Sequence, residues 1–271
     1  MKYLKSLLSI CLASSIMLSC SNGGNANKQK SVASEIDEVS VEQIVEDLAT
    51  IPTPTSFDLM SSLNKAGIPY IMDITNSLAN QQNYLSTKQK ALNLGVYGAD
   101  LSYDVTYQKK AETEEYLKCI LGLASDLNIS VDADKISEKF QNNIDNVEEL
   151  SSAVKDLIKD SQFILNQTSQ TETALLFLIG SWVESAYICV SVYEMTENGE
   201  AFADVALTHF EYSSTIIKYL ESKKADADFG GFYEQLLDIQ NKTNELKGDK
   251  ANAEKRESLI SAVKSMRNGI V

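Results

Sequence analysis

The longest apolar stretch of the chain runs from Thr173 to Tyr193, TALLFLIGSWVESAYICVSVY, and it carries one charged residue, Glu184. A helix over this stretch is apolar on nearly every face, and such a helix is buried inside something. The segments around it are instead amphipathic, with apolar residues three and four positions apart. This pattern predicts an all-α fold, a single bundle of about seven to nine helices around a central helix over 174–192.

A membrane-spanning helix is the alternative interpretation of this stretch. It is nearly long enough to cross a bilayer, but Glu184, Gly180 and three serines are unfavourable among lipid chains. The amphipathic neighbours also need an apolar partner, so we expect the stretch to form the core of a bundle.

Local signals predict the boundaries of the surrounding helices. The three prolines lie in the first third of the chain, and their absence afterwards suits long uninterrupted helices. Ser56, Asp132 and Asn146 are expected to cap the helices that follow them. The expected helices cover residues 40–50, 57–66, 70–80, 87–127, 134–143, 147–165, 200–224, 233–246 and 254–266.

Two glycines, Gly95 and Gly98, lie inside the predicted helix 87–127. Glycine in a helix interior costs about 1 kcal/mol relative to alanine. A pair this close therefore indicates a kink or a place where another backbone or a ligand comes very near. The stretch after Gly95 is weakly similar to the stretch after Gly180, since each glycine is followed by an aromatic residue, an acid and a tyrosine. Internal duplication is one hypothesis for this similarity.

Two acids in apolar surroundings are the candidates for chemistry. Asp100 shares a helical face with Tyr97 and Tyr103, and Glu184 shares one with Tyr187. A buried carboxylate must be paired, hydrogen-bonded or protonated, because an isolated buried charge is very costly. If the two glycine-bearing helices touch, the candidate partners of Glu184 are Lys88, Lys90, Tyr97 and Tyr103.

These acids allow two interpretations. One is a ligand-binding pocket, and the other is a structural network in which tyrosine hydroxyls satisfy the acids. The candidate ligand-binding residues of the pocket are Tyr97, Asp100, Tyr103, Trp182, Glu184 and Tyr187.

The sequence offers no constellation typical of an enzyme. His209 is the only histidine and lies on the apolar side of its helix, so we expect a core residue and predict no metal site and no cofactor. Di-iron Glu-x-x-His pairs, nucleophile triads and phosphate-binding glycine loops are not found. No catalytic residue is assigned. A non-enzymatic binding or interaction module is therefore favoured, with a small-ligand receptor or an enzyme using Asp100 and Glu184 as the alternative.

The chain begins with Lys2 and Lys5 and an uncharged, mostly apolar run over 6–19, the layout of a secretory signal. The end of this run, Met17-Leu18-Ser19-Cys20, resembles the lipobox of bacterial lipoproteins. The resemblance implies a signal peptide over 1–19 and a lipidated Cys20, whose several acyl chains give stable anchoring. A flexible tether over 20–34 and a helical-bundle domain over 35–271 would follow. The alternative is an ordinary secretory signal that is cleaved nearby.

The segment KALNLGVYGADLSY, residues 90–103, together with GSWVES at 180–185, resembles uncharacterised helical envelope lipoproteins of the Bacteroidetes type. This resemblance implies a location in the cell envelope, at the outer membrane facing the periplasm. An acidic run after Cys20 would indicate export to the outer surface of the cell, and none is present. Exposure at that surface is the alternative. The resemblance implies no activity.

The net charge limits which partners the chain can bind, and the cysteine positions indicate their state. Removing Lys2 and Lys5 from the 24 basic residues leaves 22 against 38 acidic ones, a formal charge of −16, so nucleic acid and anionic headgroups are poor partners. The membrane, through the lipid, and an envelope protein are the expected partners. Cys119 and Cys189 lie in apolar helical patterns and are expected to be free and buried, with a disulfide between them as the alternative.

Overall fold

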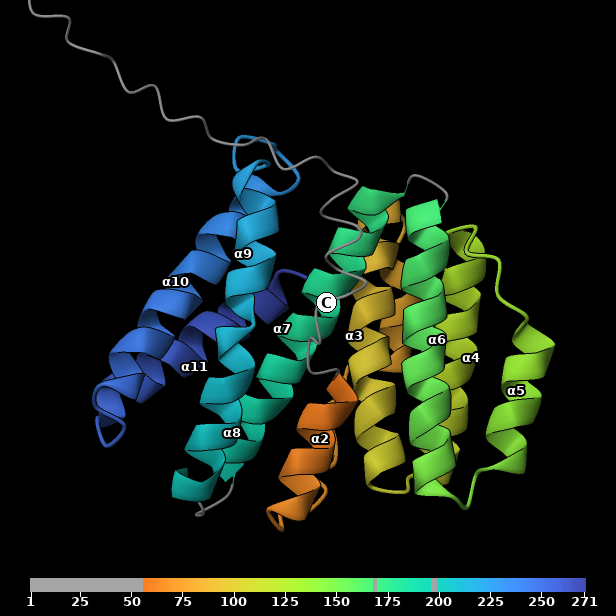
Figure 1. Cartoon of the computed structure of the whole chain (residues 1–271), viewed down its shortest axis with the longest axis horizontal. Coiled ribbons are helices and arrows are strands. Elements are labelled where there is room, and N and C mark those ends of the chain that lie inside the picture. Colours follow the sequence, from red (N-terminus) through yellow and green to blue (C-terminus); the bar gives the residue numbers. More distant parts are fainter. Residues whose placement is uncertain (1–55, 168–169, 196–198) are drawn as a thin grey trace, which may run out of the picture. The chain divides into compact units, whose positions relative to one another are not determined.

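The computed structural model of the chain describes residues 56–271, apart from residues 168–169 and 196–198. Every regular element in these residues is helical, which confirms the predicted all-α class (Figure 1). The predicted signal peptide, Cys20, the tether and the helix over 40–50 lie outside the described residues. The elements are α2 (Ser56–Lys65), η1 (Leu78–Asn83), α3 (Thr87–Thr106), α4 (Lys110–Asp126), α5 (Ala133–Asn142), α6 (Val147–Gln167), α7 (Thr171–Met195), α8 (Gly199–Glu211), α9 (Ser213–Glu221), α10 (Gly230–Lys247) and α11 (Ala253–Asn268).

The apolar stretch forms α7, the central helix of the fold. All residues from Thr173 to Val192 are buried except Leu178, Ser181 and Tyr187, which are half-buried. In Figure 1, α7 lies between α8 to α11 on one side and α3, α4 and α6 on the other. It packs most extensively against α3 and also contacts α2, α6, α8, α9 and α11. The sequence pattern therefore identified the helix on which the amphipathic ones pack.

By length and hydropathy, α7 is the one helix among the described residues that could cross a membrane. Other parts of the protein bury 83% of its most apolar window. The core helix of a water-soluble domain passes the same test, so this finding fits the bundle interpretation.

Helices α3 and α7 cross at two glycines, with their backbones in direct contact. A Cβ atom added to Gly95 would lie 2.1 Å from the carbonyl oxygen of Phe177, and one added to Gly180 would lie 1.9 Å from that of Leu92. No side chain larger than hydrogen fits at either position. The close approach expected at Gly95 is confirmed, and the partner is a backbone. The same expectation is wrong for Gly98, where an added Cβ would meet nothing within 4 Å.

The α2–α3 connection, residues 66–86, differs from the prediction. A helix was expected over 70–80, but residues 68–77 are irregular and only η1 follows, so that prediction is wrong. The backbone of this segment binds side chains of α3 instead of itself. The Ile71 N–H donates to Tyr103 Oη at 2.7 Å, and Tyr107 Oη donates to the carbonyl of Ile68 at 2.9 Å. These bonds to side chains replace the local bonds that a helix opened by Pro69 would make.

Two predicted helices are each divided, which gives ten α-helices in the described residues. The helix expected over 87–127 is interrupted between α3 and α4, where Gln108 has a φ of 58°, and the one over 200–224 is interrupted at Tyr212. The caps are confirmed at Asp132, which accepts from the Lys135 N–H, and at Asn146, which accepts from the Glu149 N–H.

Both cysteines in the described residues are free and buried. The preferred expectation for Cys119 and Cys189 is therefore confirmed, and the alternative disulfide is not formed.

The crossing yields a prediction about alanine substitutions. Gly95→Ala and Gly180→Ala force the two backbones apart and should each lower the free energy of unfolding by about 1 to 3 kcal/mol or more. Gly98→Ala, the matched control three residues away, enters open space and should raise that free energy by up to about 1 kcal/mol through helix propensity. Urea titrations of the purified variants measure all three. Equal effects at Gly95 and Gly98 would contradict the crossing.

Candidate functional site

The crossing brings the two candidate acids together in the core. Asp100 lies five residues after Gly95 on α3, Glu184 lies four residues after Gly180 on α7, and both are 0% exposed. The two carboxyl groups lie close enough for the negative charge of Glu184 to raise the pKa of Asp100. The sequence could place each acid only on its own helix, and the structure shows that they are direct neighbours.

Arg267, in the last turn of α11, is the counter-charge of Glu184. Its Nε and Nη2 donate to the two carboxylate oxygens of Glu184, each at 3.0 Å. The guanidinium also lies 4.2 Å from the centre of the Tyr187 ring. A bidentate arginine–carboxylate pair is among the strongest hydrogen-bonded arrangements in proteins. Arg267 therefore ties the C-terminal helix to the central one.

The four partners expected for Glu184 are wrong. Lys88 pairs with Asp228 at 3.0 Å, and Lys90 pairs with Asp126 at 2.6 Å, both at the surface. Tyr97 and Tyr103 bind the α2–α3 connection through their hydroxyls. No sequence signal near Glu184 indicates a partner 83 residues away. Arg267 lies in a helix whose sequence pattern is that of an amphipathic surface helix.

Asp100 and Glu184 cannot both be ionised beside one arginine without leaving a buried negative charge unpaired. Burial and the negative charge of Glu184 raise the pKa of Asp100 well above its ordinary range. Burial also raises the pKa of Glu184; Arg267 and the neighbouring Asp100 oppose this effect, but the net shift is upward. Burial lowers the pKa of Arg267, yet the Glu184 carboxylate outweighs it and the net shift is upward.

These directions place one proton on Asp100 and the negative charge on Glu184. The Oδ2 atom of Asp100 accepts from the Asn76 N–H at 3.1 Å, whereas Oδ1 has no hydrogen-bond partner. Oδ1 is therefore the atom to which we assign the proton, because a protonated Oδ1 leaves no unpaired negative charge beside Glu184.

The tyrosines around the acids hold the α2–α3 connection against α3 and α4. Tyr97 Oη donates to the carbonyl of Ser77 at 3.0 Å, and Tyr116 Oη donates to that of Asn76 at 2.8 Å. Only Tyr70 serves an acid, donating to Asp104 at 3.1 Å. Their hydroxyls are thus engaged in structural bonds. The geometry supports the structural network rather than an open pocket, although most of its tyrosines bind backbone carbonyls instead of carboxylates.

Trp182 lies away from the two acids, toward α8. Its ring stacks on that of His209, with centroids 5.7 Å apart and an angle of 11° between the planes. Its Nε1–H donates to the carbonyl of His209 at 3.4 Å. The six candidate residues therefore do not form one site: Tyr97, Asp100, Tyr103, Glu184 and Tyr187 belong to the network around the acids, and Trp182 to another part of the core.

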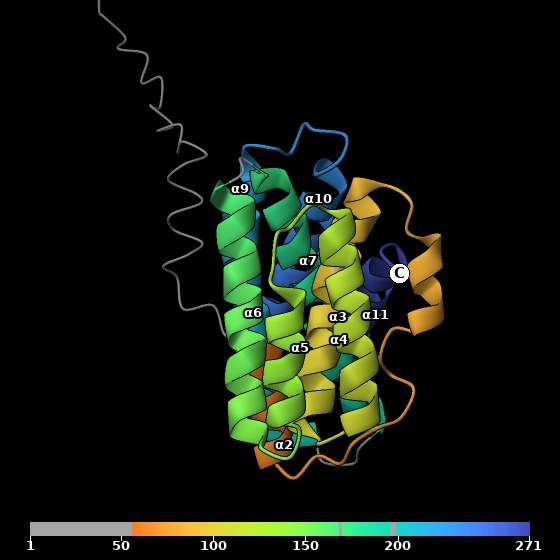
Figure 2. The same ribbon diagram turned by 90° about the vertical axis from the view of Figure 1, so that its right-hand side faces the viewer.

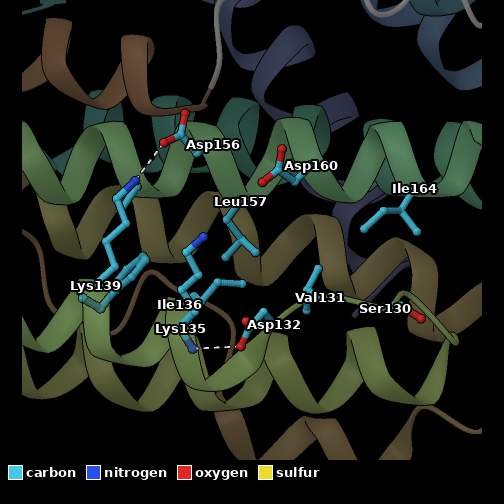
Figure 3. A pocket seen from close by; sticks show the side chains of 12 residues that line it. Ser130, Val131, Asp132, Lys135, Ile136, Lys139, Asp156, Leu157, Asp160 and Ile164 are labelled. Carbon is cyan, nitrogen blue, oxygen red and sulfur yellow. Dashed lines mark hydrogen bonds and ion pairs between the residues drawn. The ribbon is translucent and has the colours of Figure 1, made fainter.

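A cleft of about 420 Å³ lies elsewhere, between α5 and α6 (Figure 3). Its apolar lining consists of Val131, Ile136, Phe140, Ala153, Leu157 and Ile164. In Figure 3, Ile136 of α5 and Leu157 of α6 point into the space between the two helices. Figure 2 shows α5 at the outside of the bundle, next to α6. We call this space the α5–α6 cleft.

Sequence reasoning missed the α5–α6 cleft. The sequence shows an apolar pair, Ile136 and Phe140, four residues apart in an otherwise polar helix. This pattern does not reveal that a space remains between α5 and α6. Asp100 and Glu184 do not line this cleft. In the described part of the chain, no group of three or more histidine, cysteine, aspartate or glutamate residues is placed to hold a metal ion.

Comparisons with protein-family models, with curated proteins and with solved structures find no match to this chain.

The proton assignment predicts opposite results for two similar substitutions. Asp100→Asn keeps a neutral side chain of the same shape and an acceptor for the Asn76 N–H, so it should change the free energy of unfolding by less than about 1 kcal/mol. Glu184→Gln leaves the Arg267 charge buried without its partner and should cost about 3 to 5 kcal/mol. Glu184→Ala adds a cavity to that loss. Urea titrations at neutral pH make the comparison, and a Glu184→Gln variant as stable as Asp100→Asn would refute the assignment.

Asp100→Asn should also change how the free energy of unfolding depends on pH. A folded-state pKa above the ordinary value means that the folded protein binds more protons, so stability falls as pH rises from about 4. Asp100 contributes to this fall, and so does Asp104, whose pKa burial raises to about 7. Asp100→Asn should reduce the slope, leaving the part due to Asp104 between about pH 4 and 7.

Proposed function

We propose that the chain is a lipid-anchored lipoprotein of the cell envelope whose helical domain binds a partner and does not catalyse a reaction. The run of 6–19, the lipobox-like residues 17–20 and the small polar residues after Cys20 support the anchor. The domain would be held at the outer membrane, facing the periplasm.

One observation carries the binding role: the acids that could serve an enzyme are buried in the core, while the α5–α6 cleft offers an apolar concave surface of about 420 Å³. Asp100 and Glu184 are 0% exposed; Asp100 accepts from the Asn76 N–H, and Glu184 pairs with Arg267. A substrate would have to break this arrangement to reach them. The cleft can receive apolar side chains without any change in the core.

The charges around the α5–α6 cleft indicate the chemistry of the partner. Asp132, Asp156 and Asp160 line it together with Lys135 and Lys139, and Lys139 is paired with Asp156 at 2.8 Å. This leaves a net negative charge on a chain that is already strongly acidic. The partner that fits is a segment of an envelope protein with two or three apolar side chains flanked by basic ones.

A small-ligand receptor is the second candidate, because about 420 Å³ falls within the range of pockets that hold small molecules. Native mass spectrometry of the protein from its own cells separates the two, since a retained small molecule and a protein partner differ in mass.

The anchor predicts the fate of Cys20. Metabolic labelling with a fatty acid should label the parent and fail to label Cys20→Ala, because the acyl chains are attached at that residue. Cys119→Ala is the matched control and should keep the label, since Cys119 is a buried core residue. Label that persists in Cys20→Ala would rule out the lipobox interpretation.

The cleft predicts a position-specific contact in cells. A photo-crosslinking amino acid at Ile136 should give a discrete protein adduct in the envelope, whereas the same amino acid at Leu85, which is 83% exposed, should give none. Adding Ile164→Lys, which places a charge on the apolar lining, should abolish the Ile136 adduct. Adducts of equal yield at both positions, or none at Ile136, would count against the cleft as the binding surface.

A further inference from the structure

A second cleft, separate from the α5–α6 cleft, lies where α2 meets α8. It encloses about 380 Å³, with Leu59 and Asp58 of α2 on one side and Val205 and His209 of α8 on the other, and Tyr212 beyond the end of α8. Figure 1 shows α2 and α8 side by side, and the two helices are in contact. We call this space the α2–α8 cleft.

His209 is the buried polar residue of this cleft. It is 5% exposed, and its Nε2 lies 3.5 Å from the carbonyl oxygen of Trp182. A carbonyl oxygen can only accept, so the hydrogen of a neutral ring is on Nε2 and Nδ1 carries a bare lone pair. Nδ1 has no hydrogen-bond partner, and less than 1 Å² of this atom is accessible, so a donor in the cleft reaches it when neighbouring side chains shift. The histidine therefore presents a buried acceptor that nothing in the described structure satisfies.

Two further features keep Nδ1 unprotonated and hold the imidazole ring in place. Burial lowers the pKa of His209 to about 4, so the ring is neutral at physiological pH and Nδ1 stays unprotonated. The Trp182 ring covers one face of the imidazole and holds its orientation. Buried polar groups in proteins are nearly always hydrogen-bonded, and an unpaired one is a sign of an absent partner.

The rest of the lining indicates what that partner is. Leu59 and Val205 are apolar, and Tyr212 adds an aromatic ring. The carboxylate of Asp58 is paired with Lys155 at 2.6 Å, so a cation would have to displace that lysine. An anion would meet an acidic protein and a neutral histidine. The lining therefore favours an uncharged ligand with an apolar body.

We propose that the α2–α8 cleft binds a small uncharged molecule of the alcohol or phenol class, whose hydroxyl donates to Nδ1 of His209 while its apolar body packs on Leu59, Val205 and Tyr212. This site is independent of the α5–α6 cleft and of its protein partner. Occupancy would complete the hydrogen bonding of the only buried ring nitrogen without a partner in the described residues.

The test uses the fact that the chain has a single histidine. Untagged protein labelled with ¹⁵N-histidine gives one imidazole signal set, which should show the tautomer with hydrogen on Nε2. Titration with phenol should shift the Nδ1 resonance in a saturable manner. Toluene, which has a methyl group in place of the hydroxyl, should leave Nδ1 unshifted and bind at least tenfold more weakly.

Two variants complete the test. His209→Phe keeps a ring against Trp182 but lacks the acceptor, and it should bind phenol at least tenfold more weakly in calorimetric titrations. Ser62→Phe, at an exposed position lining the cleft, leaves the core intact and should block the Nδ1 shift by filling the space. An Nδ1 resonance unmoved by phenol, an equal response to toluene, or an unchanged shift in Ser62→Phe would overturn the proposal. None of these results depends on crosslinking at Ile136.

Discussion

Contact between the backbones of α3 and α7 is the constraint on which the rest of the structure depends. Without a side chain at Gly95 and Gly180, the helices approach closely enough to exclude water from the faces beside the crossing. Asp100 and Glu184 lie about one turn beyond it, within the excluded region. Two acids there need a proton and a counter-charge, because an isolated buried charge is very costly. The crossing therefore buries both acids. Protonation makes Asp100 neutral, and the Arg267 guanidinium balances the charge of Glu184.

The burial of these two acids also constrains elements that are distant in the sequence. Arg267 can reach Glu184 only if α11 lies against α7, and the Asn93 side chain fixes the same end of the chain by donating to the carbonyl of Ile270 at 3.0 Å. The Asn76 N–H can donate to Asp100 only if the α2–α3 connection is not helical at that point. A buried ion pair adds little net stability over an apolar one, since desolvation offsets its attraction. What this one provides is a single position for α11 and for the connection.

The sequence allowed prediction of features that depend on local pattern. An apolar stretch of about twenty residues identified α7, Gly95 indicated a close approach, and Asp132 and Asn146 marked helix starts. Features that depend on distant partners could not be predicted. Arg267 lies 83 residues from Glu184, and the side chains of α3 override the helix signal at Pro69. The clefts depend on how far α5 stands from α6 and α2 from α8, which no periodicity encodes.

The distribution of polar groups distinguishes the structural core from the two clefts proposed to bind. Around the α3–α7 pair, most polar side chains have partners inside the protein, and opening that region would expose an ion pair and several tyrosine hydroxyls at once. The α5–α6 and α2–α8 clefts instead lie between peripheral helices, where apolar lining faces open space and one histidine nitrogen has no partner. A ligand bound there gains contacts without a cost in the core. A centre held together by its own polar contacts, with clefts at its margins, fits the proposed binding role, because the proposed binding surfaces are not the parts that hold the fold together.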